Sequence, residues 1–113
     1  MIELYGIPNC STVKKARQWL ETNGLEYQFH DFKKEPPTKT QLMRWCKIFS
    51  WEKLLNVRGT TWRKLDAQRK EGLNQTKAMQ IMLEHPSIIK RPVLLNNQCS
   101  LVGFEELQYQ TLL

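Results

Sequence analysis

The sequence has few cysteines, and none of them lie close together. Three occur, Cys10, Cys46 and Cys99, and an odd number at such wide spacing resembles neither a disulfide framework nor a zinc site. This usage is typical of a reducing compartment. We therefore expect free thiols, with no bound metal and no bound cofactor.

Long hydrophobic runs are also absent. No apolar stretch approaches the ~18 residues of a membrane span, and the N-terminus has no basic start followed by a long apolar core. Hydrophobic residues make up 41% and charged residues 25%, as in ordinary globular proteins. The 113 residues predict one domain with a modest core. We expect a cytoplasmic monomer that does not contact membranes.

Acidic residues are the minority among the charges. Asp and Glu number 11 against 17 Lys and Arg, which gives a formal net charge of +6 and favours anionic partners. The basic residues occur in every segment, without a recognisable nucleic-acid-binding motif. Glutathione and other small anions therefore suit this charge better than nucleic acid.

The first twenty residues predict a strand, a tight loop and a helix. Ile2 and Leu4 alternate with polar neighbours before the breakers Gly6 and Pro8. Apolar residues at helical spacing then predict a helix that begins at or just beyond Cys10: Val13, Ala16, Trp19 and Leu20. Free backbone N–H groups and the positive end of the helix dipole would face the Cys10 sulfur and favour its thiolate.

Polar residues flank this cysteine on both sides. Asn9, Ser11 and Thr12 are all residue types that occur at an N-cap or in a first helical turn. Lys14 adds positive charge one turn along, where it opposes the helix dipole. It is therefore either a small destabilising feature or part of a field that holds an anion.

The remaining pattern predicts two further parts of an α/β protein. A second strand, 25–32, would pair in parallel with the first, and the double proline Pro36-Pro37 then begins a helical stretch. Its predicted elements are a helix opened by a Thr38–Gln41 capping box, a turn at 52–55, and helices 62–69 and 76–84. Strands 88–95 and 99–102 would form an antiparallel hairpin around Asn96-Asn97, followed by a helix from Phe104.

Several chemically capable side chains have a simpler structural interpretation. Cys46 lies in the apolar stripe of its helix, so we expect a buried thiol, with a role as resolving cysteine for Cys10 as the alternative. Cys99 falls in the last predicted strand and is expected to be structural. His30 is an alternative proton donor but more simply a packing residue, and His85 stands where it can serve as a helix C-terminal charge.

The order of elements and several motifs resemble a known family. The motifs are Leu4–Cys10 with Lys14–Arg17, Phe29–Asp31, Leu55–Leu65, Ile88–Pro92 and Leu101–Phe104. With them the chain resembles the arsenate reductase (ArsC)/Spx family, and within it the YffB-like branch of glutathione-dependent thiol reductases. The resemblance implies one thioredoxin-like (glutaredoxin-like) α/β domain over 1–113, a mixed sheet with an all-helical insertion at about 36–86.

The resemblance also assigns roles to residues. It makes Cys10 the nucleophile, Arg91 the side chain that faces the thiolate and its anionic substrate, and Pro92 the cis-proline opposite the cysteine. Glutathione would be the co-substrate, held by Arg91 with Lys14 and Arg58. The residues Asn9, Ser11 and Thr12 and the main chain beside Pro92 would complete the binding groove.

Departures from the family pattern separate the possible functions. Arsenate reductases of this type carry two further oxyanion-binding arginines, at positions that align here with Asn56 and Gly103. Spx-type regulators switch through a second cysteine where this chain has Val13. The resulting hypothesis is a glutathione-dependent thiol–disulfide oxidoreductase with a single catalytic cysteine. The alternatives are an arsenate reductase coupled to a glutaredoxin, and a non-enzymatic regulator or adaptor that binds a protein partner.

Overall fold

The computed structural model describes residues 1–113, and the chain divides into two compact units. Unit 1 comprises Met1–Glu35 and Arg91–Leu113, and unit 2 comprises Pro36–Lys90. The helical insertion expected at about 36–86 falls within unit 2. The single-domain organisation stays a prediction.

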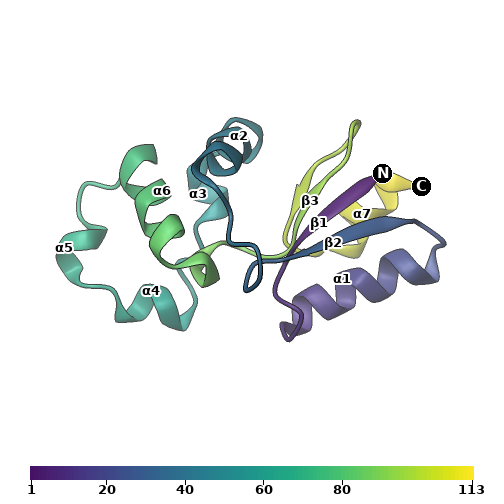
Figure 1. The fold of residues 1–113 in the computed structure, drawn as a ribbon, viewed down its shortest axis with the longest axis horizontal. Helices are drawn as coiled ribbons and strands as arrows, with labels where there is room; N and C mark the ends of the chain where they lie inside the picture. The colour runs from purple at the N-terminus through teal and green to yellow at the C-terminus, as the bar shows by residue number, and fades with distance from the viewer. The chain divides into compact units, whose positions relative to one another are not determined.

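Unit 1 is built on a four-stranded mixed sheet (Figure 1). Its strands are β1 (Ile2–Gly6), β2 (Tyr27–Asp31), β3 (Val93–Leu95) and β4 (Leu101–Val102), in the spatial order β2-β1-β3-β4. Strand β1 pairs in parallel with β2 and antiparallel with β3, and β3 pairs antiparallel with β4. The predicted parallel pair and the predicted hairpin are therefore both confirmed.

Two helices cover one face of this sheet. They are α1 (Ser11–Thr22) and α7 (Glu106–Tyr109), and α7 continues as a 3-10 turn over Gln110–Leu112. Both share one apolar cluster with the strands. Its fully buried members include Leu4, Ala16, Leu20, Leu94 and Tyr109. Side chains alternate across a strand, so the even-numbered residues of β1 supply this core.

The other face of β1 carries a polar and aromatic cluster. The parallel register sets Tyr5 beside His30, and their rings stack with centroids 4.4 Å apart. The His30 Nε2 lies 2.6 Å from Glu3 Oε2. His30 is thus a packing histidine within unit 1, as the simpler interpretation of the sequence predicted.

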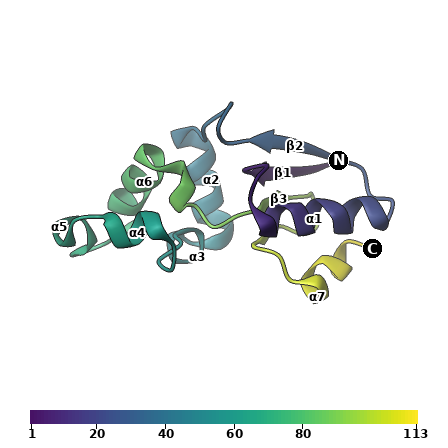
Figure 2. The same ribbon diagram turned by 90° about the horizontal axis from the view of Figure 1, so that it is seen from below.

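Unit 2 is entirely helical. It contains α2 (Lys39–Phe49), α3 (Trp51–Leu54), α4 (Thr60–Lys64), α5 (Ala67–Lys70), α6 (Gln75–Glu84) and a 3-10 turn over Pro86–Ile88. The predicted capping box starts α2: Gln41 N–H donates to Thr38 Oγ1 at 3.1 Å, and Thr38 N–H donates to Gln41 Oε1 at 2.9 Å. Helix α2 packs beside α6 (Figure 2). No helix of the protein has both the length and the apolar character needed to cross a membrane.

The predicted interior of unit 2 is largely confirmed. Cys46 is buried in the apolar stripe of α2 together with Leu42, Trp45 and Phe49. In α6 the structure buries Ala78, Met79, Ile81 and Met82, whereas Leu83 is half-buried. The Cys46 thiol is therefore a core group.

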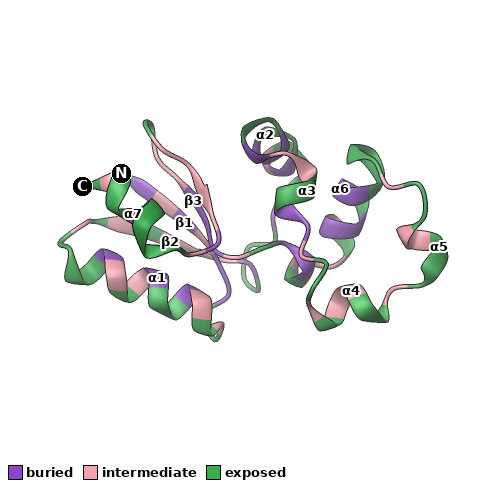
Figure 3. Ribbon diagram, turned by 180° about the vertical axis from the view of Figure 1, so that it is seen from behind, coloured by how far each residue is buried: buried purple, intermediate pink, exposed green.

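The predicted helix at 62–69 is wrong. The backbone turns extended at Leu65 and Asp66, with ψ of 144° at both, and separates α4 from α5. Neither short helix has a buried residue (Figure 3). Without an apolar face to pack, this segment lacks the tertiary contacts that normally sustain a continuous helix.

The third strand is much shorter than the predicted 88–95. Ile88 ends a 3-10 turn and Ile89 forms a β-bridge with Leu55, both as buried residues of unit 2. Strand β3 begins only at Val93, directly after a proline that cannot donate to a strand ladder. Cys99 lies before β4 rather than in it, with Sγ 3.3 Å from Thr111 Oγ1, and the last helix begins at Glu106 rather than Phe104.

The two units differ sharply in charge. Residues 36–90 hold eleven Lys and Arg against four Asp and Glu, a formal net charge of +7, whereas unit 1 holds six against seven, a net charge of −1. Basic residues occur in both units, as the sequence indicated. The excess, however, belongs entirely to the helical unit.

One close approach in unit 1 generates a stability prediction. A Cβ at Gly6 would lie 2.8 Å from Val13 Cγ2, and Val13 is fully buried with a stiff, β-branched side chain. We expect Gly6→Ala to lower the free energy of unfolding by about 1–3 kcal/mol, measured by urea denaturation.

A double variant tests the cause of that loss. Val13→Ala removes the methyl groups that the new Cβ would meet. The double variant Gly6→Ala/Val13→Ala should therefore lose less stability than the sum of the two single changes. Strictly additive losses would contradict steric conflict between these positions.

Candidate active site

A tight turn carries the chain from the end of β1 to the start of α1. Cys10 N–H donates to Ile7 O at 3.2 Å, which closes a four-residue turn whose second residue is Pro8, the position that proline favours. Lys14 N–H then donates to Cys10 O at 2.9 Å as the first bond of the helix. Cys10 is thus the N-cap of α1, and the helix begins just beyond it at Ser11, within the range that the sequence predicted.

Helix-start donors and one guanidinium act on the Cys10 thiol. Its partial burial is the largest single influence and raises the pKa. The N–H of Val13, a hydrogen bond from the Arg91 side chain, the N–H of Thr12 and the positive charge of Arg91 all lower it. Their sum outweighs burial, so the pKa of Cys10 lies below its ordinary value. The sulfur makes no regular capping hydrogen bond, so these donors act as a cluster around it.

The sheet register explains why Arg91 reaches Cys10. Strand β3 pairs antiparallel with β1, with Val93 opposite Tyr5. Arg91 precedes this strand by two residues, at the end of the pair where β1 leads into the Cys10 loop. The peptide bond between Arg91 and Pro92 is cis, and Pro92 O accepts a hydrogen bond of 2.9 Å from Gly103 N–H.

The other predicted site residues have varied positions. Asn9 and Ser11 are exposed next to Cys10, and Thr12 directs its backbone N–H at the sulfur. Lys14 is exposed on α1 and is not among the groups that change the pKa of Cys10. Arg58 is an exposed residue of unit 2, and its part in the site stays a prediction.

Neither of the other cysteines stands ready to resolve a disulfide on Cys10. All three thiols are free. Cys46 is buried within unit 2. Cys99 follows the turn after β3. Pro92 stands at the other end of this three-residue strand, which is about 10 Å long at a rise of about 3.3 Å per residue.

Gly103 adopts a conformation that disfavours larger residues. Its φ is +79°, in the left-handed region, which costs an L-residue roughly 1–2 kcal/mol. An arginine at this position would therefore be strained. The other position compared with arsenate reductases, Asn56, uses its Oδ1 to accept the backbone N–H of Arg58 at 3.0 Å.

One contributor to the site was missed at the sequence level. The spacing of Val13 marked it only as a core residue of the helix, yet its N–H is the donor that lowers the pKa of Cys10 most. The general rule that the first helical N–H groups are unpaired indicated such donors. It did not identify which of them faces the sulfur.

Comparisons with known proteins place this chain among relatives of similar length. The model of the ArsC family matches residues 5–112. A protein of Haemophilus influenzae, described as uncharacterized, is 43% identical over 110 residues, covering 97% of this chain and 96% of the relative. The global transcriptional regulator Spx of Streptococcus mutans is 28% identical and covers 94% of this chain and 78% of its own length.

Solved structures agree over nearly the whole chain. The structure of the protein YffB superposes with a TM-score of 0.94 at 45% identity, covering 98% of this chain and 97% of that one. An arsenate reductase (ArsC) related protein from Brucella melitensis gives a TM-score of 0.79, also at 45% identity, over 97% of this chain and 92% of its own.

The geometry around Cys10 predicts its reactivity. In a Cys46→Ala/Cys99→Ser background, where Cys10 is the single thiol, we expect the midpoint of iodoacetamide alkylation below the value of about 8.5 for an unperturbed cysteine. Arg91→Met should raise that midpoint, because it removes one hydrogen bond and the nearby charge. Alkylation rates across pH measure both.

Lys14→Met is the matched control for this experiment. It also removes one positive charge from the neighbourhood of Cys10, but from a side chain that is not among the main influences on its pKa. It should therefore shift the midpoint less than Arg91→Met. Equal shifts in the two variants would mean that general charge, rather than the Arg91 contact, controls the thiol.

Proposed function

The chain belongs to the ArsC family, and from that premise we propose that it is a glutathione-dependent thiol–disulfide oxidoreductase that acts through Cys10 alone. The four-stranded mixed sheet, with its helices between β2 and β3, is the thioredoxin-like α/β fold of this family. The observation that supports the proposal best is the lowered pKa of a partly exposed, helix-start Cys10 beside Arg91.

The proposed reaction takes place in two exchanges. The Cys10 thiolate attacks the glutathione sulfur of a mixed disulfide RS–SG, the S–S bond breaks, and RS⁻ leaves and takes a proton as RSH. The thiolate of a second glutathione then attacks the glutathione sulfur bound to Cys10, releasing GSSG and restoring the Cys10 thiolate. The net reaction converts RS–SG and GSH into RSH and GSSG.

The state of the other two cysteines supports the proposal of an external thiol. Cys46 is buried in the core of unit 2, and Cys99 follows the far end of β3. Three residues after Cys10, where a second cysteine could resolve the disulfide, the helix has Val13. A small thiol that diffuses to the exposed side of Cys10 meets none of these restrictions.

Arg91 has two compatible tasks in this reaction. Its guanidinium stabilises the attacking thiolate, and its remaining N–H groups can hold a glutathione carboxylate in a forked contact. The backbone beside Pro92 and the loop residues Asn9 and Ser11 offer hydrogen-bonding groups to the peptide portion of glutathione. Lys14 is the further cation of unit 1 that we propose for its second carboxylate.

Arsenate reduction is the second candidate, because Arg91 beside a thiolate is also an oxyanion site and one similar structure is described as arsenate reductase related. Against it, Gly103 has a backbone conformation unsuited to an arginine. Arsenate, with a glutaredoxin and glutathione as the electron donors, therefore belongs in the assay as a competing substrate.

The proposal is tested by turnover of the mixed disulfide of cysteine and glutathione, coupled to glutathione reductase and followed through NADPH consumption. We expect wild type and Cys99→Ser to turn over alike. Cys10→Ser should fall to the uncatalysed rate, because it lacks the attacking thiolate. Mass spectrometry should find one glutathione on Cys10 during turnover.

Other outcomes select other functions. Saturable thiol consumption that depends on arsenate would favour the oxyanion reductase. An inert Cys10, in a protein whose cellular effect survives Cys10→Ser, would favour a regulator or adaptor, the role named for the Spx relatives. Either result would overturn the thiol–disulfide proposal.

A further inference from the structure

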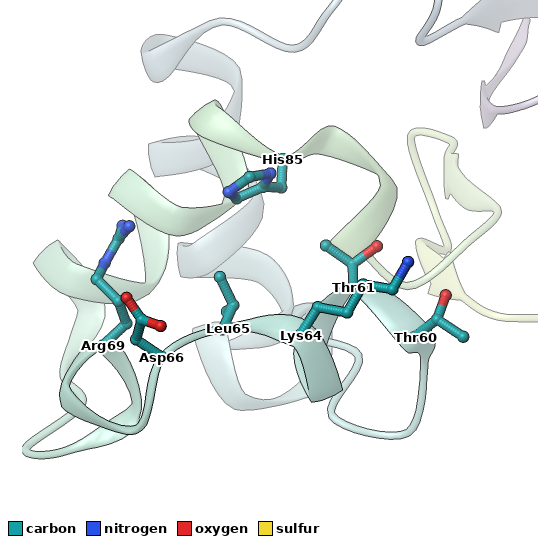
Figure 4. Close-up of a pocket in the computed structure, with 7 residues that line it drawn as sticks. All are labelled: Thr60, Thr61, Lys64, Leu65, Asp66, Arg69 and His85. Atoms are coloured by element: carbon teal, nitrogen blue, oxygen red, sulfur yellow. The ribbon is translucent and has the colours of Figure 1, made fainter.

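A pocket lies in unit 2, outside the residues proposed for thiol chemistry. It has a volume of about 390 Å³ and opens between α4 and the end of α6 (Figure 4). Helix α4 contributes Thr60, Thr61 and Lys64, and His85 lies across from them after α6. Figure 4 shows the Lys64 amine beside Thr61, with the His85 ring above Leu65. One end of the pocket therefore combines a cation and two hydroxyls, and an imidazole borders its middle.

The other end has a different character. Leu65 lies between the two ends in Figure 4, and Asp66 lies beside Arg69. The Arg69 guanidinium is held by both carboxylate oxygens of Glu84, at 2.9 and 3.3 Å, so its charge is largely satisfied. This end offers an apolar surface and a carboxylate that can accept a hydrogen bond from a hydroxyl.

At the cationic end of the pocket, Lys64 and Thr61 have hydrogen-bonding groups available for a ligand. Lys64 forms no ion pair or side-chain hydrogen bond within the protein. Thr61 Oγ1 lies 2.9 Å from Ser87 Oγ. A hydroxyl has one donor and two acceptor positions, so this contact leaves Thr61 able to bond a ligand.

Charge and size limit the ligand. Unit 2 carries the whole positive excess of the chain, with eleven basic residues against four acidic ones, and its field attracts anions. The volume of about 390 Å³ falls in the range of about 300–1,000 Å³ that small-molecule sites occupy. That space accommodates an organic group as well as an anion.

We propose that this pocket binds a phosphomonoester of a small hydroxylated molecule. The phosphate lies at Lys64, with hydrogen bonds from Thr60 and Thr61, and the His85 ring borders the middle of the ligand. The carbon chain of the ligand covers Leu65, and a ligand hydroxyl donates to Asp66. The site is independent of Cys10, since no group of the proposed thiol reaction lies in it.

Three probes separate the parts of this ligand: ribose 5-phosphate, ribose and inorganic phosphate. Each is titrated into ¹⁵N-labelled protein at 0.15 M salt, and the amide shifts are followed. We expect ribose 5-phosphate to shift the amides of residues 60–66 and 85 and to saturate. Ribose should not bind, and inorganic phosphate should bind at least fivefold more weakly than the ester.

Lys64→Gln is the decisive variant, and Lys53→Gln is its matched control. Both lysines are exposed residues in the last turn of a short helix of unit 2, but only Lys64 lines the pocket. Loss of a charged hydrogen bond to phosphate should weaken ribose 5-phosphate about tenfold in Lys64→Gln. Lys53→Gln should change its affinity less than twofold.

Three results would overturn the inference. The first is the absence of saturable shifts in the pocket, and the second is equal weakening in the two lysine variants, which means diffuse charge alone. The third is inorganic phosphate that binds as tightly as the ester, which removes the organic part of the ligand. Amide spectra that match wild type outside the pocket ensure that a lost affinity in Lys64→Gln is not a folding defect.

Discussion

The close contact between Gly6 and Val13 is the constraint on which the site in unit 1 depends. The absent side chain at Gly6 lets the end of β1 approach the first turn of α1. Val13 fills that space with its side chain and directs its N–H at the Cys10 sulfur. Packing and electrostatics are therefore supplied by the same residue, and the helix start cannot move without changing both.

The acidity of Cys10 arises from a balance between opposing effects. Partial burial favours the neutral thiol, and four smaller contributions from two backbone donors and Arg91 favour the thiolate. Two of those contributions come from the Arg91 side chain, which precedes the strand β3 that pairs with β1. The reactive state thus depends on a contact between chain segments about eighty residues apart in the sequence as much as on the local helix.

The features predictable from sequence were those set by neighbouring residues. The helix start at Cys10, the Thr38–Gln41 capping box and the buried stripe around Cys46 all follow from local spacing. The prediction of a long strand from Ile88 was wrong because an apolar run does not show which hydrophobic core its residues join. Ile88 and Ile89 are buried in the helical unit 2. The break at Leu65 separates two short helices without a buried residue, and the spacing of apolar residues in the sequence did not indicate it.

The chain returns from unit 2 to unit 1 directly before Arg91. The residue that precedes it, Lys90, is tied into unit 2 by a hydrogen bond of 2.7 Å from its N–H to Leu54 O, and Ile89 bridges Leu55. Local unfolding of this short bridge would release the backbone on one side of Arg91 while the sheet stays intact. Arg91, which acts on the thiolate from unit 1, therefore follows directly in the chain after a residue whose backbone is hydrogen-bonded within unit 2.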